Sequence, residues 1–242
     1  MPPVLYKYYA PERFHVLTDC YVRFSQRAVF EDDRELQPEV AAFGTGDEIR
    51  TFCDANPQMR EYPELLREAV IHRLLNQPGE QDRFVRLVQA SMVSPNEFGV
   101  FCLSEDPNSE QMWNDYADHG RGFVAAFDTT YRAFSGLRQP GRLGRVEYSD
   151  EPLGTFLGSY GGGAFFRKRN RYRFEAEWRS VRPLQLLERT GVGSPAIYVS
   201  PFNPECLVEI LIRPECTVEW QLRHLAAIDA RYRHTRVRLV PS

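Results

Sequence analysis

The sequence predicts a single α+β domain over residues 1–242, with a split antiparallel sheet core flanked by helices. Strand-like segments outnumber long helical ones, and the two kinds do not alternate as a doubly wound sheet requires. Of the 242 residues, 43% are hydrophobic, which is enough to bury a substantial core. These observations favour a mixed α+β architecture over a parallel α/β one.

Strands are predicted where apolar residues alternate with polar ones or run together between turn residues. The predicted strands cover residues 4–9, 21–25, 98–103, 122–127, 142–148, 171–181, 207–212 and 236–240. A turn or short helix at residues 12–17 separates the first two.

Packing helices are predicted where apolar residues recur every third or fourth position, at residues 64–75 and, after a Pro-Gly break, at residues 84–92. The expected apolar face of the first helix consists of Leu65, Leu66, Ala69, Val70 and Leu74. A capped helix is also expected near the carboxyl end, at residues 217–230.

A short helix is expected to carry Met112, Trp113 and Tyr116 on one side. Asn108 can cap its start, with a glutamine three residues on, and Gly120 can end it. The apolar face of this helix favours core packing for Trp113 and Tyr116.

Composition is that of an ordinary globular protein. The formal net charge of -3 argues against a generic polyanion binder, which usually carries a strong basic excess. Five cysteines without a C-x-x-C pair favour a reducing cytoplasm. The first residues lead directly into a strand, and no apolar run approaches 18 residues, so neither a signal sequence nor a membrane span is expected.

Residues 171–181 are the most informative stretch, because ring or small residues alternate with charges at the period of a β-strand. On such a strand, Glu175 and Glu177 would point the same way with backbones about 6.6 Å apart. Like charges at this spacing favour an acid/base or cation-stabilising site. The alternative is a solvated strand face on which Arg173 and Arg179 neutralise the acids.

A glycine-rich segment at residues 158–163 carries Tyr160 and precedes this strand. A flexible connection and a substrate-facing loop both fit its composition. The five histidines are isolated, and neither a Walker loop nor a G-x-G-x-x-G is present. If a dinucleotide binds, it therefore binds outside a Rossmann fold.

Several motifs appear in the order of a known pattern. They are Leu5-Tyr6-Lys7-Tyr8, Phe30-Glu31-Asp32-Asp33, Phe101-Cys102-Leu103-Ser104-Glu105, residues 112–117, residues 119–123 and Glu175-Ala176-Glu177-Trp178-Arg179. On these motifs the chain resembles, from residue 5 to about 215, the bacterial family catalogued as domain of unknown function 2971. It departs from that pattern at Glu31-Asp32-Asp33, at Tyr172 and in the connection before the last strand. That family has no settled activity, so this resemblance bears on the fold.

A second resemblance bears on mechanism. Glu175-Ala176-Glu177 after an aromatic-bearing loop is similar to the last motif of Glu-x-Glu ADP-ribosyltransferases, and a polar first strand and a strand ending in Ser104 are similar to their earlier motifs. The resemblance implies that Glu177 stabilises the oxocarbenium-like cation formed from NAD, while Glu175 orients or deprotonates the acceptor. It also implies that Glu177 lies in a cleft near Tyr6 and Ser104.

The same resemblance implies roles for further residues. Ser104 would support Glu177 or the ribose. Tyr6, Lys7 or Tyr8 would contact the adenosine ribose or the pyrophosphate, and Tyr116 or Tyr160 would stack on nicotinamide. The expected partners are NAD as substrate, a protein or nucleic-acid acceptor and a possible regulatory protein, with no metal and no membrane. Such an enzyme would suit a bacterial toxin or a phage-defence effector.

Two other classes of function stay open. A nucleic-acid-binding or nuclease module could use the basic run Arg167, Lys168, Arg169, Arg171 and Arg173. Its Mg²⁺ would be held by Asp32, Asp33, Glu175 and Glu177. In a non-catalytic sensor domain, the acidic pair would be a surface feature only.

Overall fold

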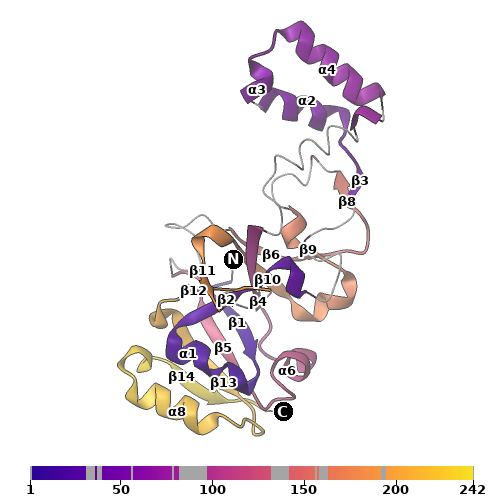
Figure 1. The fold of residues 1–242 in the computed structure, drawn as a ribbon. Coiled ribbons are helices and arrows are strands. Elements are labelled where there is room, and N and C mark those ends of the chain that lie inside the picture. Colours follow the sequence, from indigo (N-terminus) through magenta and orange to yellow (C-terminus); the bar gives the residue numbers. More distant parts are fainter. Residues whose placement is uncertain are drawn as a thin grey trace. The chain divides into compact units, whose positions relative to one another are not determined.

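The computed structural model describes residues 2–30, 36, 40–55, 57–77, 79–81, 97–131, 142–155, 157, 163–191 and 195–241. The chain divides into two compact units (Figure 1). The sheet unit comprises Met1–Phe30, Asn96–Tyr148 and Arg169–Ser242, and the inserted unit comprises Glu31–Pro95 and Ser149–Lys168. The prediction of one domain over residues 1–242 stays a prediction.

A seven-stranded sheet forms the centre of the sheet unit, and the α+β class is confirmed. Its strands lie in the order β14 (Arg236–Leu239), β13 (Leu207–Ile212), β5 (Phe123–Asp128), β1 (Val4–Tyr9), β4 (Phe98–Ser104), β10 (Glu177–Pro183) and β6 (Arg142–Arg145). All neighbours are antiparallel except β13 and β14. A short strand, β7 (Glu147–Tyr148), follows β6.

One face of this sheet, called here the core face, carries the main hydrophobic core. Leu5, Phe101 and Phe127 alternate inward along their strands, as period-two patterning dictates. They pack with α1 (His15–Asp19) and α8 (Glu219–Ile228). A second sheet of β11 (Glu188–Thr190), β12 (Ile197–Pro201) and β2 (Tyr21–Phe24) joins them through Val22 and Phe24.

The opposite face, called here the site face, is covered in part by α6 (Glu110–Tyr116) (Figure 1). Tyr8 and Val124 of the sheet pack there against Met112 and Trp113 of the helix. The Tyr8 and Trp113 rings meet edge to face with centroids 5.6 Å apart. This cluster is smaller than that of the core face, and strand register places Ser104, Glu177 and Arg179 elsewhere on the site face, beside the apolar residues Val100, Ala126 and Val181.

The ends of α6 differ from expectation. Ser109, not Asn108, is the N-cap, because its Oγ accepts a hydrogen bond from the Met112 amide at 3.4 Å. The predicted end at Gly120 is wrong, because α6 ends at Tyr116 with Ala117 as its C-cap; a left-handed turn follows, in which Asp118, His119 and Gly120 have φ values of 50°, 55° and 82°. Gly122 follows, where a Cβ would lie 1.9 Å from the Tyr9 carbonyl oxygen, so only glycine lets β5 begin beside β1.

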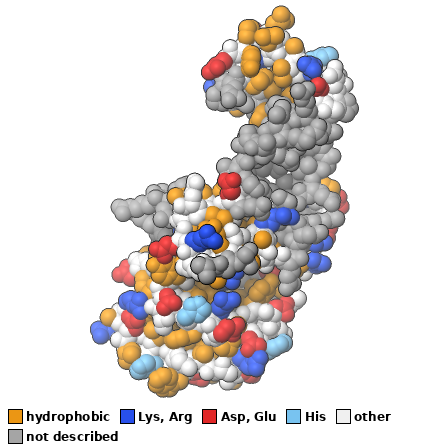
Figure 2. Space-filling model, viewed as in Figure 1, with side chains coloured by type: hydrophobic (Ala, Val, Ile, Leu, Met, Phe, Trp, Pro, Cys, Tyr) orange, Lys and Arg blue, Asp and Glu red, His pale blue; other side chains and the backbone are white. Residues whose placement is uncertain are grey.

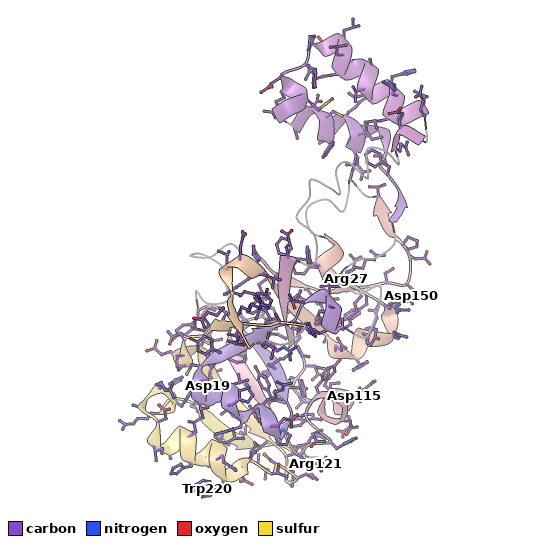
Figure 3. The ribbon with its side chains drawn as sticks, in the orientation of Figure 1. Asp19, Arg27, Asp115, Arg121, Asp150 and Trp220 are labelled. Atoms are coloured by element: carbon purple, nitrogen blue, oxygen red, sulfur yellow. The ribbon has the colours of Figure 1, made fainter. Side chains whose placement is uncertain are left out.

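The helix α8 begins without a side-chain cap. The hydroxyl of Thr217, which precedes it, donates instead to the Arg121 carbonyl at 3.3 Å. Trp220 lies on its outer side (Figure 3). Short 3-10 helices complete the sheet unit at Pro11–Phe14, Arg27–Val29, Asn170–Glu175, Leu184–Leu186, Pro204–Cys206 and Ala230–Tyr232.

The inserted unit contains α2 (Gly46–Ala55), α3 (Pro57–Arg60), α4 (Glu64–Asn76) and the parallel pair β3 (Val40–Ala42) and β8 (Leu153–Thr155). A 3-10 helix at Gly163–Phe166 and the short strand β9 (Arg167–Lys168) end its second segment. Its small core includes Phe43, Ile49, Cys53, Ile71, Leu74 and Leu157.

The predicted apolar face of α4 is wrong. Of its five residues only Leu74 is buried, and Leu65 is 81% exposed. Hydrophobic side chains accordingly gather on the viewed surface over these helices (Figure 2). The helix predicted at residues 84–92 lies outside the described residues. In the part of the chain that the structure describes, no helix is long and apolar enough to cross a bilayer.

Candidate functional site

Three of the predicted site residues lie in one row across the sheet. Tyr6 of β1 is the cross-strand partner of Ser104 of β4, and Ser104 is also the partner of Glu177 of β10. Because directly opposed residues of paired strands project from the same face, all three lie on the site face. The expected proximity of these three segments is therefore confirmed.

The segment that carries the two glutamates is not one strand, so the prediction of a strand over residues 171–181 is wrong. Asn170–Glu175 is a 3-10 helix, Ala176 is left-handed with φ 42°, and β10 begins only at Glu177. Glu175 and Glu177 consequently do not share a strand face. A left-handed alanine costs on the order of 1 kcal/mol, and such strain is often found at functional sites.

Tertiary hydrogen bonds override the strand pattern here. The Ser104 hydroxyl donates to the Glu175 carbonyl at 2.7 Å, and the Glu105 amide donates to the Ala176 carbonyl at 2.9 Å. Ser104 also accepts from the Asp106 amide at 3.1 Å. A serine hydroxyl has one proton to donate. Because Ser104 donates it to the Glu175 carbonyl, Ser104 supports the backbone that joins the two glutamates.

Glu177 forms a buried ion pair with Arg179, two residues along the same face of β10. Nε of Arg179 donates to Oε1 at 2.8 Å and Nη2 donates to Oε2 at 3.0 Å. The side chains of Arg179 and Glu177 are 0% and 3% exposed. The solvated strand face considered above is therefore wrong, although Arg179 does neutralise Glu177 as that alternative expected.

The pair also fixes the geometry of the carboxylate. A guanidinium stays charged at any ordinary pH, and its fork sets the orientation of the carboxylate it binds. The Glu177 amide donates to the Tyr148 hydroxyl at 2.7 Å, which anchors the first residue of β10. Because Glu177 and Ser104 are buried, the expected cleft above them stays a prediction.

Glu175 accepts a hydrogen bond from a tyrosine hydroxyl. The Tyr116 hydroxyl, at the end of α6, donates to Oε1 of Glu175 at 2.8 Å. Glu175 is 4% exposed, whereas Tyr116 is 44% exposed, so the core packing expected for Tyr116 is wrong while that of Trp113 is confirmed. Stacking of Tyr116 on nicotinamide stays a prediction.

The three residues expected on the first strand separate by face. Lys7 projects onto the core face, with Nζ 5.5 Å from the centre of the Phe101 ring, so it does not join Tyr6 and Tyr8. Strand alternation is the reason. Tyr8 is buried and donates to the Asp106 carbonyl at 2.7 Å, and burial raises its pKa.

Tyr6 is the first-strand residue that remains in the row. It is partly buried, and desolvation raises its pKa, with a further rise from the Glu209 carboxylate. Tyr160 lies outside the described residues.

The basic run divides between the units after Lys168. Arg167 donates to the Glu151 carbonyl at 3.0 Å, Arg171 to the Tyr172 hydroxyl at 2.7 Å, and Arg173 to Asn170 Oδ1 at 2.9 Å. Lys168 lies in β9 and Arg169 precedes the 3-10 helix. On the viewed face of the sheet unit, basic and acidic side chains are intermixed (Figure 2). Nucleic-acid binding by this run stays a prediction.

Among the described residues, no group of three or more His, Cys, Asp or Glu side chains could hold a metal ion. Asp32 and Asp33 lie outside them, so the proposed Mg²⁺ set is untested.

Sequence reasoning anticipated one support of the site, the neutralisation of Glu177 by Arg179, and missed the other, the bond from Tyr116 to Glu175. Glu177 and Arg179 are two residues apart, and this spacing on a strand predicts a shared face, so the ion pair had a local signal. The Tyr116–Glu175 bond joins residues 59 positions apart and had none.

Comparisons with protein-family models, with curated proteins and with solved structures give no match. The two family resemblances therefore stay predictions, and the function is argued from the geometry of the site face.

Proposed function

We propose that this protein cleaves NAD and transfers ADP-ribose to a macromolecule. The observation that carries the proposal is the row Tyr6, Ser104 and Glu177 on three adjacent strands. Those are the three strands on which the resemblance to ADP-ribosyltransferases places the functional residues. Glu175, the last residue of the preceding 3-10 helix, is separated from Glu177, the first residue of β10, by the left-handed Ala176 alone.

In the proposed reaction, the bond between the nicotinamide nitrogen and C1′ of the ribose breaks, and its electron pair stays on the nitrogen. The ribose acquires oxocarbenium character. The Glu177 carboxylate, held in one orientation by Arg179, stabilises that cation and accepts a hydrogen bond from a ribose hydroxyl. Each carboxylate oxygen has the capacity to accept more than one hydrogen bond.

The second half of the reaction forms a bond between C1′ and a nucleophilic atom of the acceptor. The acceptor's proton passes to the Glu175 carboxylate and then to solvent. When water takes the acceptor's place, the products are free ADP-ribose and a proton, and the reaction becomes NAD hydrolysis. The same carboxylate therefore bears on the ratio of transfer to hydrolysis.

Burial sets a condition on this chemistry. With Glu177 at 3% exposure, a ribose reaches the carboxylate only when neighbouring side chains are displaced. Substrate binding should consequently be accompanied by a rearrangement around β10 and the 3-10 helix before it.

The order of the sequence motifs supports the further proposal that the chain belongs to the domain of unknown function 2971 family. Action in the bacterial cytoplasm, as a toxin or phage-defence effector, is part of the same proposal.

The test is incubation of the purified chain with labelled NAD, alone and with cell extract, in EDTA. We expect release of nicotinamide and label on protein or nucleic acid. No release under any condition would contradict the proposal. Loss of DNA or RNA that requires Mg²⁺ would favour the nuclease alternative.

The buried ion pair also favours one competing function, a non-catalytic binding or sensor domain. In that case the ion pair of Glu177 and Arg179 has a structural role only, and the protein does not cleave NAD. The double substitution described at the end of the Discussion separates the two.

A further inference from the structure

Tyr116 combines an exposed ring with a hydroxyl directed at a buried acid. Its ring is 44% exposed, while the Glu175 carboxylate that its hydroxyl contacts at 2.8 Å is 4% exposed. A ring so exposed contributes little to packing. The directed hydrogen bond is therefore the contact that distinguishes this tyrosine from its neighbours on α6.

The helix that carries Tyr116 is firmly held. Trp113 is completely buried and its indole N–H donates to the Pro107 carbonyl at 3.0 Å. The Arg213 guanidinium lies 4.7 Å from the centre of that indole and binds the Glu110 carboxylate through two hydrogen bonds. Tyr116 is the last residue of the helix, and the left-handed residues Asp118, His119 and Gly120 turn the chain directly after it. The hydroxyl of Tyr116 is thus presented from a rigid support.

Glu175, in contrast, is the last residue of a 3-10 helix and is followed by the left-handed Ala176. Its backbone is fixed by Ser104, but a glutamate side chain has three rotatable bonds. Fixing such a side chain costs conformational entropy of about 1 kcal/mol or more, which a specific contact must offset. Tyr116 supplies a contact of this kind.

We infer that Tyr116 is a positioning residue that sets the orientation of Glu175 toward the acceptor and so determines how much ADP-ribose is transferred and how much is hydrolysed. The inference rests on the proposed function. A Glu175 carboxylate in a fixed orientation favours removal of the proton from a bound macromolecule, whose position is also fixed. A mobile water molecule can adjust its position and is less sensitive to the orientation of Glu175. Loss of the hydroxyl should therefore reduce transfer more than hydrolysis.

The substitution Tyr116→Phe separates this role from stacking on nicotinamide. Phenylalanine keeps the ring and removes only the hydroxyl, so a stacking residue would tolerate the change. We expect the ratio of transferred to hydrolysed ADP-ribose to fall about tenfold, with little change in KM for NAD. The matched control is Tyr21→Phe, which removes a tyrosine hydroxyl whose pKa is raised by the Glu188 carboxylate elsewhere in the sheet unit. It should leave the ratio unchanged.

A double-mutant cycle with Glu175→Gln completes the test. If Tyr116 acts through Glu175, adding Tyr116→Phe to Glu175→Gln should change the ratio no further. An unchanged ratio in Tyr116→Phe, or independent effects that multiply in the double variant, would overturn the inference while nicotinamide release by the wild type upholds the proposed function. Absence of release by the wild type would instead overturn the proposed function, and this inference with it.

Discussion

The two faces of the central sheet are built on different principles. On the core face, residues such as Leu5 and Phe127 are buried among apolar neighbours, and strand alternation alone places them there. On the site face, Glu177 and Arg179 are buried as a charged pair. Isolated burial of either charge would cost several kcal/mol, so each depends on the other. The core face is stabilised by many apolar contacts, whereas the strand β10 on the site face depends on the specific ion pair of Glu177 and Arg179.

The largest effect should follow substitution of a single partner of the pair. In Glu177→Gln the amide N–H₂ must face one guanidinium N–H of Arg179, and the buried arginine loses its counter-charge. We expect a loss of about 3 to 5 kcal/mol in the free energy of unfolding. Turnover of the molecules that remain folded should fall on the order of 10² to 10³. Although glutamine preserves the shape of the side chain, it does not replace the charge that the buried Arg179 requires.

Urea unfolding followed by nicotinamide release, normalised to the folded fraction, measures both effects. A variant with wild-type stability would mean that the pair is not buried in solution. Full activity per folded molecule would remove Glu177 from the mechanism.

The difference between the faces also decides what the sequence could predict. The bounds of β1, β4, β5 and β13 follow from local apolar patterning and turn residues, and the structure confirms them to within one or two residues. The α+β class follows from the same patterns. Local patterning failed at residues 171–181, where hydrogen bonds from Ser104 and Glu105 fix a 3-10 helix and a left-handed residue instead of a strand.

Other failures have the same physical origin. The apolar residues of α4 have helical spacing, but spacing does not say what lies opposite them, and Leu65 is exposed. The resemblance to ADP-ribosyltransferases offered Tyr6, Lys7 or Tyr8 of the first strand as contacts of NAD, but strand alternation sends Lys7 to the other face. Contacts between distant segments, such as Tyr116 with Glu175, leave no trace in a single sequence.

A second, smaller effect is expected on the core face. Leu5 is fully buried and lies beside Tyr6 on β1, pointing the other way. Leu5→Ala should lower the free energy of unfolding by about 2 to 5 kcal/mol, because it leaves a cavity. Nicotinamide release per folded molecule should stay at the wild-type level. A loss of activity per folded molecule would show that packing on the core face controls the geometry of the site face.

The smallest effect concerns the exposed carboxylate that supports α6. Hydrogen bonds from the buried Arg213 lower the pKa of Glu110 below its usual value. A group with a lowered folded pKa contributes stability above its unfolded pKa and loses it as the pH falls through the folded one. The wild type should therefore be slightly more stable than Glu110→Gln near neutrality, and the difference should vanish in acid.

Urea midpoints of the two proteins between neutral pH and about pH 3 provide the measurement. A difference that stays constant across this range would mean that the charge of Glu110 does not contribute.

The central claim, that Glu177 is the carboxylate that stabilises the cation formed from NAD, is tested most directly by replacing both members of its ion pair. Exchange of a buried pair for apolar residues of similar volume is often neutral or stabilising, so Glu177→Leu with Arg179→Met should fold. The measurement is nicotinamide release by this folded double variant beside the wild type. We expect nicotinamide release by the wild type and a loss on the order of 10² or more in the folded double variant. Release at the wild-type rate by the folded double variant would exclude Glu177 from this role.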